Sequence, residues 1–475
     1  MSARDGAADR AVLAFGEREW DRAQLDAIAG GLASGLRARG VGAGQRVALM
    51  SSNRPEFVSA VLAIWRLGAA VVLLSPAWKR TEVDHALALT NPVDAVGDHP
   101  LLAAFMPMLH LDEPVFWSGD VVDRASRESD ALFVFSSGTA GMPKAVRHTH
   151  GSLGAAVGHW RGALGLTSRD RIQVVTPPSH ILGLLNIMTA LDAGAWVRLH
   201  PRFDLDAMLG CIEGDRITVE MAVAPIALAL AMHPRLESFD LSSLRYIMWC
   251  ATPVTSSVAE TVSRRTGVGF LTAYGTTEVP VIACHPLDVD AARLDTVGRP
   301  VPGVSVRVVS LDTGEPVGAG ETGEIVVRSD SLMAGYLPVE DTANALCDGW
   351  YRTGDVGCLD SEGWLRITDR SKEMIKVRGF AVAPAEIESV LLGHPGVTDC
   401  AVFGVPDCRD GEAVVAAVAV SDPVAADELV ELVASRLTSY KRPSRVVFVS
   451  AIPRLPSGKV LRRVLKERYG CPSDS

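Results

Sequence analysis

Apolar residues recur along the chain in two alternating patterns, one with helical spacing and one in short continuous runs. Residues 24–39 have the helical spacing, and residues 46–52 (RVALMSS) form a short run. Residues 55–68 return to the helical spacing, and residues 69–75 (AAVVLLS) form the next run. Strands that alternate with helices at this spacing predict parallel sheets covered by helices. A second block of the same kind extends from residue 171 to about residue 282.

The pattern changes after Val297, where short strands separated by Gly/Pro turns replace the helices. The clearest of these strands are residues 304–310, 323–329 and 364–368. A mixed α/β pattern resumes after the charged stretch DRSKE, residues 369–373. We therefore expect an α/β protein with a large N-terminal domain, residues 1–371, and a small mobile α+β C-terminal domain, residues 372–475. The N-terminal domain should contain two helix-covered sheets and a β-rich subdomain.

Composition narrows the class of protein. The chain has 475 residues, which is too long for one hydrophobic core, and 48% of them are hydrophobic. A net charge of −10 argues against a nucleic-acid binder. The eight cysteines form no CxxC pair, as expected for reduced thiols in a cytoplasmic protein. The start of the chain has no signal-peptide pattern, and Arg66 interrupts the most apolar stretch, so we expect no membrane span.

One loop, FSSGTAGMPKA at residues 135–145, contains small hydroxyl residues, glycines and a single lysine. Its hydroxyls and glycine N–H groups can form an anion-binding nest, and Lys144 adds a positive charge. The residues before it resemble a strand and those from His150 onward a helix. It does not match the Walker A pattern. Taken alone, the loop is equally well explained as a flexible turn.

Four later segments contain residues suited to nucleotide chemistry, although each also has an ordinary explanation as a turn or a solvated charge. In AYGTTE, Tyr274 can stack on a base, Thr277 can donate to phosphate and Glu278 can hold Mg²⁺. In GWYRTGD, Asp355 can accept two hydrogen bonds from ribose hydroxyls. The other two segments are TDRSKEMIKVRGF, residues 368–380, and PRLPSGKVLRR, residues 453–463.

The five segments in this order resemble the acyl-adenylate-forming superfamily of acyl-CoA synthetases, luciferases and peptide-synthetase adenylation domains. The resemblance extends from about Trp20 to Arg463 and is closest to the 4-coumarate and fatty-acid CoA ligase branch. NRPEFVSAVLAIWRLGA, VGRPVPG, GETGEIVVRS and GFAVAPAEIE also match. The resemblance implies an AMP-forming acid–thiol ligase that uses ATP, Mg²⁺ and coenzyme A, or another thiol acceptor. A carboxylate would attack the α-phosphorus of MgATP, and a thiol would then attack the acyl-adenylate.

The resemblance also assigns roles to individual residues. Lys459, Glu278, Thr277 and His180 would be catalytic, with Glu278 coordinating Mg²⁺ and Lys459 bridging the carboxylate and the nucleotide. The residues implied to bind ATP or coenzyme A are Ser136, Ser137, Gly138, Thr139, Gly141, Lys144, Thr252, Tyr274, Asp355, Arg370, Lys376 and Gly379. Lys372 would be the hinge about which the C-terminal domain rotates, so that Lys459 leaves and Gly379 arrives between the half-reactions.

The sequence departs from the family pattern in the hydroxyl-rich loop, at Ala140 and Ala145, where the changes are small and should be tolerated, and in the acyl pocket. The residues implied to line it are His180, Leu182, Asn186, Cys250, Ala251, Ala273, Val279 and Pro280. Cys250 and Ala273 stand where relatives have glycine, so they should fill part of the pocket. We therefore expect a compact aromatic or short aliphatic acid with a neutral tail. Selective use of C14–C18 acids would contradict this expectation.

The acceptor stays open at the level of sequence. Coenzyme A is the leading hypothesis, and a carrier-protein thiol, an amine or a nitrite-type activated group are alternatives. A non-catalytic nucleotide-binding protein is disfavoured, because Glu278, Asp355, Arg370 and Lys459 are all present. The expected partners are a small carboxylic acid and a carrier protein as one option, without nucleic acid or membrane. The oligomeric state is open, and a homodimer is one option.

Overall fold

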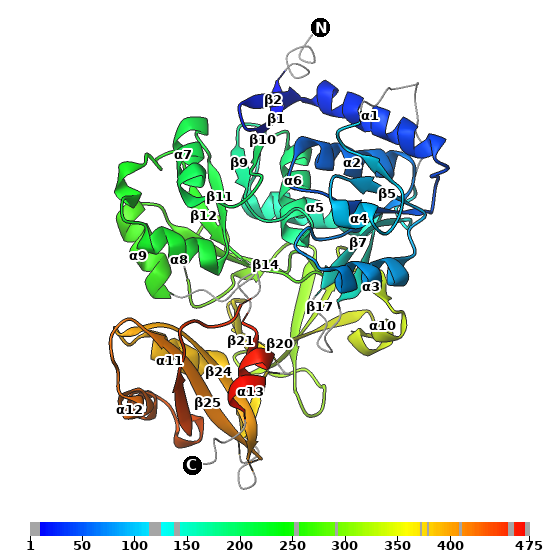
Figure 1. Cartoon of the computed structure of the whole chain (residues 1–475). Helices are drawn as coiled ribbons and strands as arrows, with labels where there is room; N and C mark the ends of the chain where they lie inside the picture. The colour runs from blue at the N-terminus through cyan, green and yellow to red at the C-terminus, as the bar shows by residue number, and fades with distance from the viewer. Residues whose placement is uncertain are drawn as a thin grey trace.

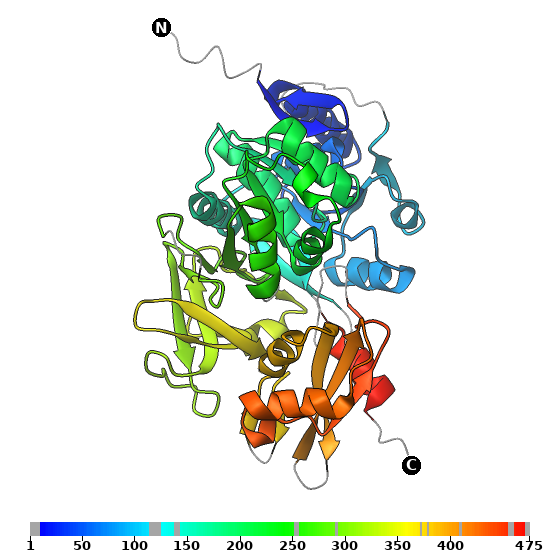
Figure 2. The same ribbon diagram turned by 90° about the vertical axis from the view of Figure 1, so that its left-hand side faces the viewer.

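The computed structural model describes residues 10–113, 125–136, 143–250, 256–289, 293–370, 373–377, 380–407, 411–454 and 460–470. This part of the chain contains four sheets. Two large sheets and a β-rich sheet form the N-terminal part, and the fourth sheet lies below them in a separate C-terminal part (Figures 1 and 2). The predicted α/β architecture with a small C-terminal domain is thus confirmed.

The first large sheet has seven strands. Their order is β18 (Gly335–Leu337), β8 (Lys144–Thr149), β7 (Asp130–Ser136), β4 (Ala70–Leu73), β3 (Arg46–Met50), β5 (Asp94–Gly97) and β6 (Met108–His110). From β7 to β6 all neighbours are parallel, whereas β8 and β18 are antiparallel additions. The helices in the same stretch of chain are α1 (Arg22–Ala38), α2 (Pro55–Arg66), α3 (Arg80–Thr90), α4 (Pro100–Ala103) and α5 (His150–Leu164).

The second large sheet has nine strands. Their order is β15 (Arg299–Pro300), β14 (Ala283–Cys284), β13 (Phe270–Tyr274), β12 (Tyr246–Trp249), β11 (Val219–Ala222), β9 (Arg171–Val174), β10 (Trp196–Leu199), β1 (Ala11–Phe15) and β2 (Arg18–Asp21). Its helices are α6 (Ile181–Ala193), α7 (Leu205–Asp215), α8 (Ala224–Met232) and α9 (Ser256–Thr266), with a 3₁₀ turn at Leu236–Ser238. Among the described residues, no helix is long and apolar enough to cross a membrane.

The β-rich sheet and the C-terminal sheet are mainly antiparallel. The β-rich sheet contains β16 (Val304–Val309), β17 (Gly323–Ser329), β20 (Trp350–Leu359), β19 (Leu346–Cys347) and β21 (Leu365–Arg370), with α10 (Glu340–Ala345) beside it. The C-terminal strands are β23 (Phe380–Val382), β22 (Ile375–Val377), β25 (Gly411–Val420), β24 (Val397–Asp407) and β26 (Arg445–Phe448). Its helices are α11 (Pro384–Leu392), α12 (Ala426–Arg436), α13 (Arg462–Tyr469) and the 3₁₀ turn Ser439–Lys441.

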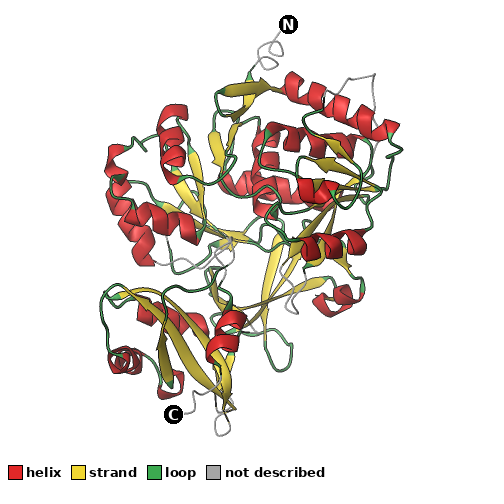
Figure 3. Cartoon of the chain, viewed as in Figure 1, coloured by secondary structure: helices red, strands yellow, loops and turns green. Residues whose placement is uncertain are grey.

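Helices α5 and α6 connect the two large sheets. Helix α5 packs against β7 and β8, α6 packs against β9 and β10, and the two helices pack on each other. Figure 3 shows these helices between the yellow strands of the two sheets. The apolar residues that meet here include Trp160, Leu184 and Ile187, all nearly inaccessible to solvent. One hydrophobic core, which extends from Leu13 on β1 to Leu365 on β21, therefore spans both sheets.

Three elements differ from the sequence prediction. Strand β8 lies between the hydroxyl-rich loop and α5, so the loop joins two antiparallel strands and does not lead directly into a helix. Helix α10 occupies a region where no helix was expected, because its six residues EDTANA include no buried side chain and therefore no apolar face. Helix α13 has only Leu465 buried, so its charged sequence also lacked a helical apolar pattern.

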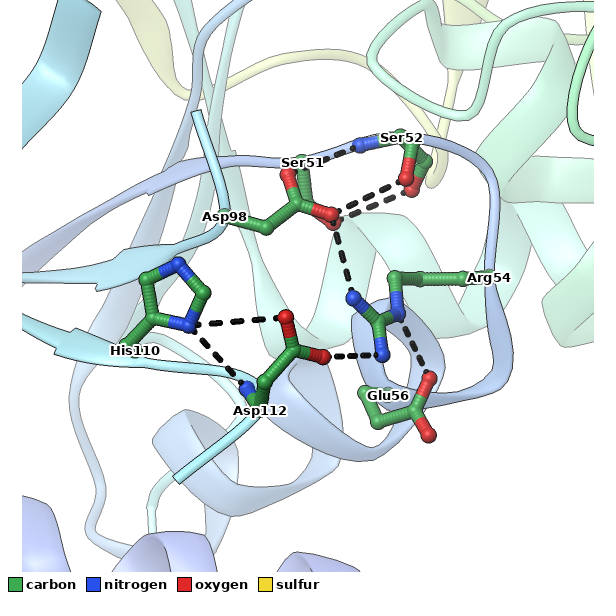
Figure 4. A network of polar contacts seen from close by, with 7 residues as sticks. All are labelled: Ser51, Ser52, Arg54, Glu56, Asp98, His110 and Asp112. Carbon is green, nitrogen blue, oxygen red and sulfur yellow. Dashed lines mark hydrogen bonds and ion pairs between the residues drawn. The ribbon is translucent and has the colours of Figure 1, made fainter. Parts of the chain in front are cut away.

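A polar network closes one end of the first sheet, after β3, β5 and β6 (Figure 4). The guanidinium of Arg54 lies 2.7 Å from Glu56, 3.3 Å from Asp98 and 2.7 Å from Asp112. The hydroxyl of Ser52 also donates to Asp98 over 3.0 Å. Arg54 belongs to the NRPEF segment quoted above. Its contacts join the segments that follow β3, β5 and β6, so its role in the structure is to hold this end of the sheet together.

A second polar network is buried inside the nine-stranded sheet. The amide nitrogen of Gln173 donates to the carboxyl of Glu220 over 2.5 Å, and the amide oxygen of Gln173 lies 2.7 Å from Nε2 of His200. Burial raises the pKa of Glu220 to about 8 and lowers the pKa of His200 to about 4. Both side chains are therefore neutral in the folded protein near pH 7.

Glu220 should make stability fall as the pH rises from about 5 to 8. In this window the folded carboxyl keeps its proton while the unfolded one has lost it, so unfolding releases a proton. Relative to Glu220→Gln, which cannot titrate, the wild-type protein should lose roughly 1–2 kcal/mol between pH 6 and pH 8. Denaturant unfolding at both pH values measures this difference, and His200 contributes equally to both proteins. Glu213→Gln, which changes an exposed carboxylate on α7, is the control. If the free energies of unfolding of the wild type and Glu220→Gln changed with pH in parallel, the prediction would be contradicted.

Candidate active site

The AYGTTE segment forms a tight turn at the end of β13. The amide of Ile282 donates to the carbonyl of Tyr274 over 2.8 Å, and the amide of Thr276 donates to the carbonyl of Val279 over 2.9 Å. A Cβ on Gly275 would lie 2.1 Å from the carbonyl oxygen of Pro280, so only glycine fits at this position. The turn therefore holds Thr277 and Glu278 at its tip.

Two neighbouring segments fix this turn, strand β8 of the first sheet and the loop between β17 and β18. Nε2 of His148, on β8, lies 2.8 Å from the carbonyl oxygen of Thr277, which only accepts, so the imidazole donates. The amide of Met333 donates to the carbonyl of Glu278 over 2.8 Å. Burial lowers the pKa of His148, so the ring remains neutral and keeps this tautomer. The backbone that carries Thr277 and Glu278 is thus anchored on both sides.

The GWYRTGD segment meets the same turn through its aspartate. The hydroxyl of Tyr274 donates to Oδ2 of Asp355 over 2.5 Å, although the two residues lie 81 positions apart. Asp355 is 4% exposed, and Tyr274 is 8% exposed. Asp355 and Arg370 are partners in the antiparallel pairing of β20 with β21. The structure therefore brings three of the predicted nucleotide-binding positions together, with Arg370 described in its backbone only.

The two ends of the hydroxyl-rich loop lie next to this cluster. Ser136 and Lys144 are register partners at the end of the β7/β8 pair. Nζ of Lys144 lies 3.0 Å from Asp341 on α10 and 5.4 Å from the ring centre of Tyr336. The hydroxyl of Tyr336 donates to Oε1 of Glu278 over 2.8 Å. Lys144 therefore contacts the ring of this tyrosine, and Glu278 contacts its hydroxyl.

His180 caps the N-terminus of α6. Its Nδ1 accepts a hydrogen bond from the amide of Leu182 over 3.4 Å, so Nε2 carries the proton of the neutral ring. The side chain reaches solvent, yet desolvation by the surrounding protein lowers its pKa. The lowered pKa keeps the imidazole neutral near pH 7. The preceding loop is close-packed, because a Cβ on Gly183 would lie 2.3 Å from the carbonyl of Pro177.

The predicted acyl-pocket residues lie on α6, β12, β13 and the turn after β13. Cys250 and Ala273 follow the paired residues Trp249 and Thr272 on adjacent strands, so they stand side by side. Both are buried, and burial raises the pKa of Cys250 to about 12, which keeps it a neutral thiol. The remaining described positions of the set are Leu182, partly buried, Asn186 and Val279, buried, and Pro280, partly buried.

Asn186 is held by a tryptophan on the neighbouring helix. The indole N–H of Trp160 donates to Oδ1 of Asn186 over 2.7 Å. Because an indole nitrogen only donates, the oxygen of the Asn186 amide must face Trp160. Asn186 is 1% exposed and Trp160 is 2% exposed. The Trp160 ring therefore packs against α6 beside Asn186, which is one of the predicted pocket residues.

Several predicted positions lie outside the described residues. They are Ser137, Gly138, Thr139, Gly141, Ala251, Thr252, Lys372, Gly379 and Lys459. Lys376 lies in β22 and, like Arg370, is described in its backbone only. The predicted hinge and the lysine expected to be most important for catalysis thus stay predictions.

The surroundings of Glu278 suit a metal ion shared with a substrate. Glu278 is 7% exposed, and one of its oxygens accepts the hydrogen bond from Tyr336. Among the described residues, no group of three or more His, Cys, Asp or Glu side chains is arranged to hold a metal ion. Mg²⁺ commonly binds through one or two carboxylates and completes its shell with substrate phosphates and water. A single buried carboxylate near the loop that is predicted to bind phosphate fits that mode.

Sequence reasoning did not identify His148, Tyr336, Tyr351 and Asp341 as part of this site. His148 and Thr277 lie 129 positions apart, and Tyr336 and Glu278 lie 58 positions apart. Neither pair has a local sequence signal, because each contact forms only when β8, β13 and β18 are assembled. Asp341 lies on α10, the helix that the apolar pattern did not predict.

The chain matches two family descriptions. Residues 2–337 match "AMP-binding enzyme", and residues 386–459 match "AMP-binding enzyme C-terminal domain". The first matched segment includes the described parts of the cluster up to Leu337, and the second includes β24, β25 and β26 of the C-terminal sheet. They agree with the division into a large N-terminal part and a separate C-terminal part.

Individual relatives cover almost the whole chain. A feruloyl-CoA synthase from Amycolatopsis is 36% identical over 462 residues, covering 94% of each chain. A long-chain-fatty-acid–CoA ligase from Mycobacterium tuberculosis is 33% identical over 477 residues, covering 94% of this chain and 92% of its own. The crystal structure of ATP-bound MatB from Rhodopseudomonas palustris is 29% identical with a TM-score of 0.91, covering 97% and 96% of the two chains. The chain therefore belongs to the AMP-binding enzyme family, in its acid–CoA ligase branch.

Proposed function

We propose that this protein is an ATP-dependent acid:CoA ligase acting on a compact aromatic or short aliphatic carboxylic acid. The observation that supports the proposal most directly is the hydrogen bond between Tyr274 and Asp355. It joins two separate nucleotide-binding motifs, and Glu278 lies at the tip of the turn that Tyr274 begins. A base, a ribose and a metal-bound phosphate can therefore be held by neighbouring groups.

In the first half-reaction, a carboxylate oxygen of the acid attacks the α-phosphorus of ATP. The bond from that phosphorus to the bridging oxygen breaks, and pyrophosphate leaves with the electron pair. Tyr274 and Thr252 hold adenine, and Asp355 and Arg370 bind the ribose hydroxyls. Thr277 donates to the α-phosphate, and Lys459 stabilises the charge that develops on the phosphoryl oxygens.

The phosphate and acid ends of the site complete the first half-reaction. The segment from Ser136 to Lys144, including Ser137, Gly138, Thr139 and Gly141, holds the β- and γ-phosphates. Glu278 would hold Mg²⁺, which would neutralise phosphate charge when bound. His180 lies at the carboxylate end of the acid. These assignments place one cation or hydrogen-bond donor at each anionic part of ATP.

In the second half-reaction, the coenzyme A sulfur attacks the acyl carbon of the adenylate. The acyl carbon–oxygen bond breaks and AMP leaves. We propose that residues 1–371 and 372–475 act as the two domains, with a hinge at Lys372. Rotation removes Lys459 and brings Lys376 and Gly379 to the thiol channel, so one small domain serves both steps.

The compact substrate follows from the side-by-side packing of Cys250 and Ala273. Side chains at both positions occupy space that two glycines would leave open. Each methylene that a substrate cannot fit costs about 1–3 kcal/mol of discrimination, so a long acyl chain should be strongly disfavoured. Leu182, Val279 and Pro280 add apolar surface, consistent with a neutral tail. Ala251 belongs to the same proposed lining.

A panel of acids tests the substrate proposal. Pyrophosphate release should show higher kcat/KM for cinnamic, benzoic or C4–C6 acids than for C14–C18 acids. Cys250→Gly should enlarge the pocket and raise relative activity on the longer acids. A wild-type preference for C14–C18 acids would contradict the proposed substrate class.

A further inference from the structure

Three buried tyrosines meet around the predicted metal carboxylate. Tyr274 is on β13 of the nine-stranded sheet, Tyr336 is on β18 of the seven-stranded sheet, and Tyr351 is on β20 of the β-rich sheet. Their exposed fractions are 8%, 8% and 4%. Tyr336 contacts Glu278, and Tyr351 interacts with Glu278, Tyr336 and Tyr274, so the three phenols lie near one another and near this carboxylate.

Tyr336 has the direct contact with Glu278. Its hydroxyl donates to Oε1 over 2.8 Å. A phenol has one proton, so this hydrogen bond uses its only donor and fixes the direction of the hydroxyl. With Oε1 engaged, Oε2 is the carboxylate oxygen that the phenol leaves available for a cation.

Tyr351 belongs to the same buried cluster as Tyr336 and interacts with it. Burial, the negative charge of Glu278 and contact with Tyr336 raise the pKa of Tyr351 well above its usual value. Burial and Glu278 likewise raise the pKa of Tyr336. An ordinary phenol has a pKa of about 10, so the Tyr336 hydroxyl keeps its proton and its hydrogen bond to the carboxylate at neutral pH.

The Tyr336 ring is itself held in place. The backbone of Tyr336 is fixed by two contacts. Its amide donates to the hydroxyl of Thr342 over 2.9 Å, and β18 pairs Tyr336 with Val146 on β8. The ammonium of Lys144 lies 5.4 Å from the ring centre. A fixed ring gives the hydroxyl a fixed position, so the Glu278 carboxylate is oriented by a rigid neighbour.

We propose that Tyr336, supported by Tyr351, is a positioning residue that orients the Glu278 carboxylate toward the Mg²⁺ of MgATP. The proposal rests on the assignment of Glu278 to Mg²⁺ in the proposed function. Mg²⁺ requires near-ideal octahedral geometry, so a carboxylate that is free to rotate binds it less well. Partners that orient a metal ligand typically contribute 10–100-fold to metal affinity.

Tyr336→Phe removes the hydroxyl and keeps the ring with its Lys144 contact. We expect the Mg²⁺ concentration that gives half-maximal pyrophosphate release to rise about 10-fold. At saturating Mg²⁺, kcat should return to within a few fold of the wild-type value. Tyr351→Phe should shift the Mg²⁺ requirement in the same direction by a smaller factor. Binding of AMP in EDTA, measured by calorimetry, should be unchanged because no metal takes part.

Tyr246→Phe is the matched control. Tyr246 is also buried, and its hydroxyl donates to the carbonyl of Leu164 over 2.5 Å, away from Glu278. This control should lower thermal stability without moving the Mg²⁺ requirement. If Tyr336→Phe weakens AMP binding in EDTA as much as MgATP use, the hydroxyl is merely structural and the proposal is overturned.

Glu278→Gln in the same titration separates this inference from the proposed function. A shift for Glu278→Gln and for Tyr336→Phe supports both. A shift for Glu278→Gln without one for Tyr336→Phe overturns the positioning role and leaves the metal assignment intact. An unchanged Mg²⁺ requirement for Glu278→Gln overturns the metal assignment, and the positioning role with it.

Discussion

Lys459→Ala should lower the rate of pyrophosphate release by about 10²–10³-fold, the usual effect of removing one donor that stabilises transition-state charge. The loss should appear mainly in kcat, because the lysine is proposed to act on charge that develops during phosphoryl transfer. Thioester formation from a synthetic acyl-adenylate and coenzyme A should continue at a rate within about twofold of wild type. The reason is that the proposed rotation removes Lys459 from the site before the thiol attacks.

The measurement needs both half-reactions in the same preparation. Pyrophosphate release reports the first step, and consumption of the pre-made adenylate with coenzyme A reports the second. Lys466→Ala, which removes an exposed lysine from α13, is the matched control and should leave both rates unchanged. Equal loss of both half-reactions in Lys459→Ala would contradict the proposed division of roles.

Glu278→Gln is the second change with a large expected effect. Glutamine keeps an oxygen that can accept the Tyr336 hydrogen bond, but it removes the negative charge that would bind Mg²⁺. The rate of pyrophosphate release should fall about 10²–10³-fold at a Mg²⁺ concentration that saturates the wild-type protein. Raising Mg²⁺ should recover part of this loss.

The control for Glu278→Gln is Glu362→Gln, an exposed carboxylate paired with Arg293 at 3.4 Å. It has the same change in charge and should retain full activity. Circular dichroism and thermal unfolding confirm that Glu278→Gln is folded. A folded Glu278→Gln enzyme with wild-type activity would remove Glu278 from the proposed chemistry.

The fold was largely predictable because most of its elements have apolar patterns of their own. Helix α2 buries Phe57, Val58, Val61 and Ile64, and β4 is buried at all four positions. Elements without such a pattern were missed. Helix α10 has no buried residue, and the six residues of β8 do not alternate, because Ala145, Val146 and His148 are the buried ones.

The candidate site was predictable at the positions that belong to short motifs, and less so elsewhere. Tyr274, Glu278 and Asp355 each lie in a recognisable segment, and the structure places them together. His148 and Tyr336 lie outside those turns and act across 129 and 58 positions. Which side chains face them depends on how three sheets meet, and one sequence contains no local signal for that arrangement.

The acceptor and the overall reaction are tested most directly by one measurement. The purified protein is incubated with MgATP and a compact aromatic acid, with and without coenzyme A, and the products are identified by mass spectrometry. The proposed function predicts AMP and pyrophosphate with an acyl-CoA thioester when coenzyme A is present, and bound acyl-adenylate when it is absent. Pyrophosphate release without any acyl-CoA, or no adenylate from any acid in the panel, would contradict it.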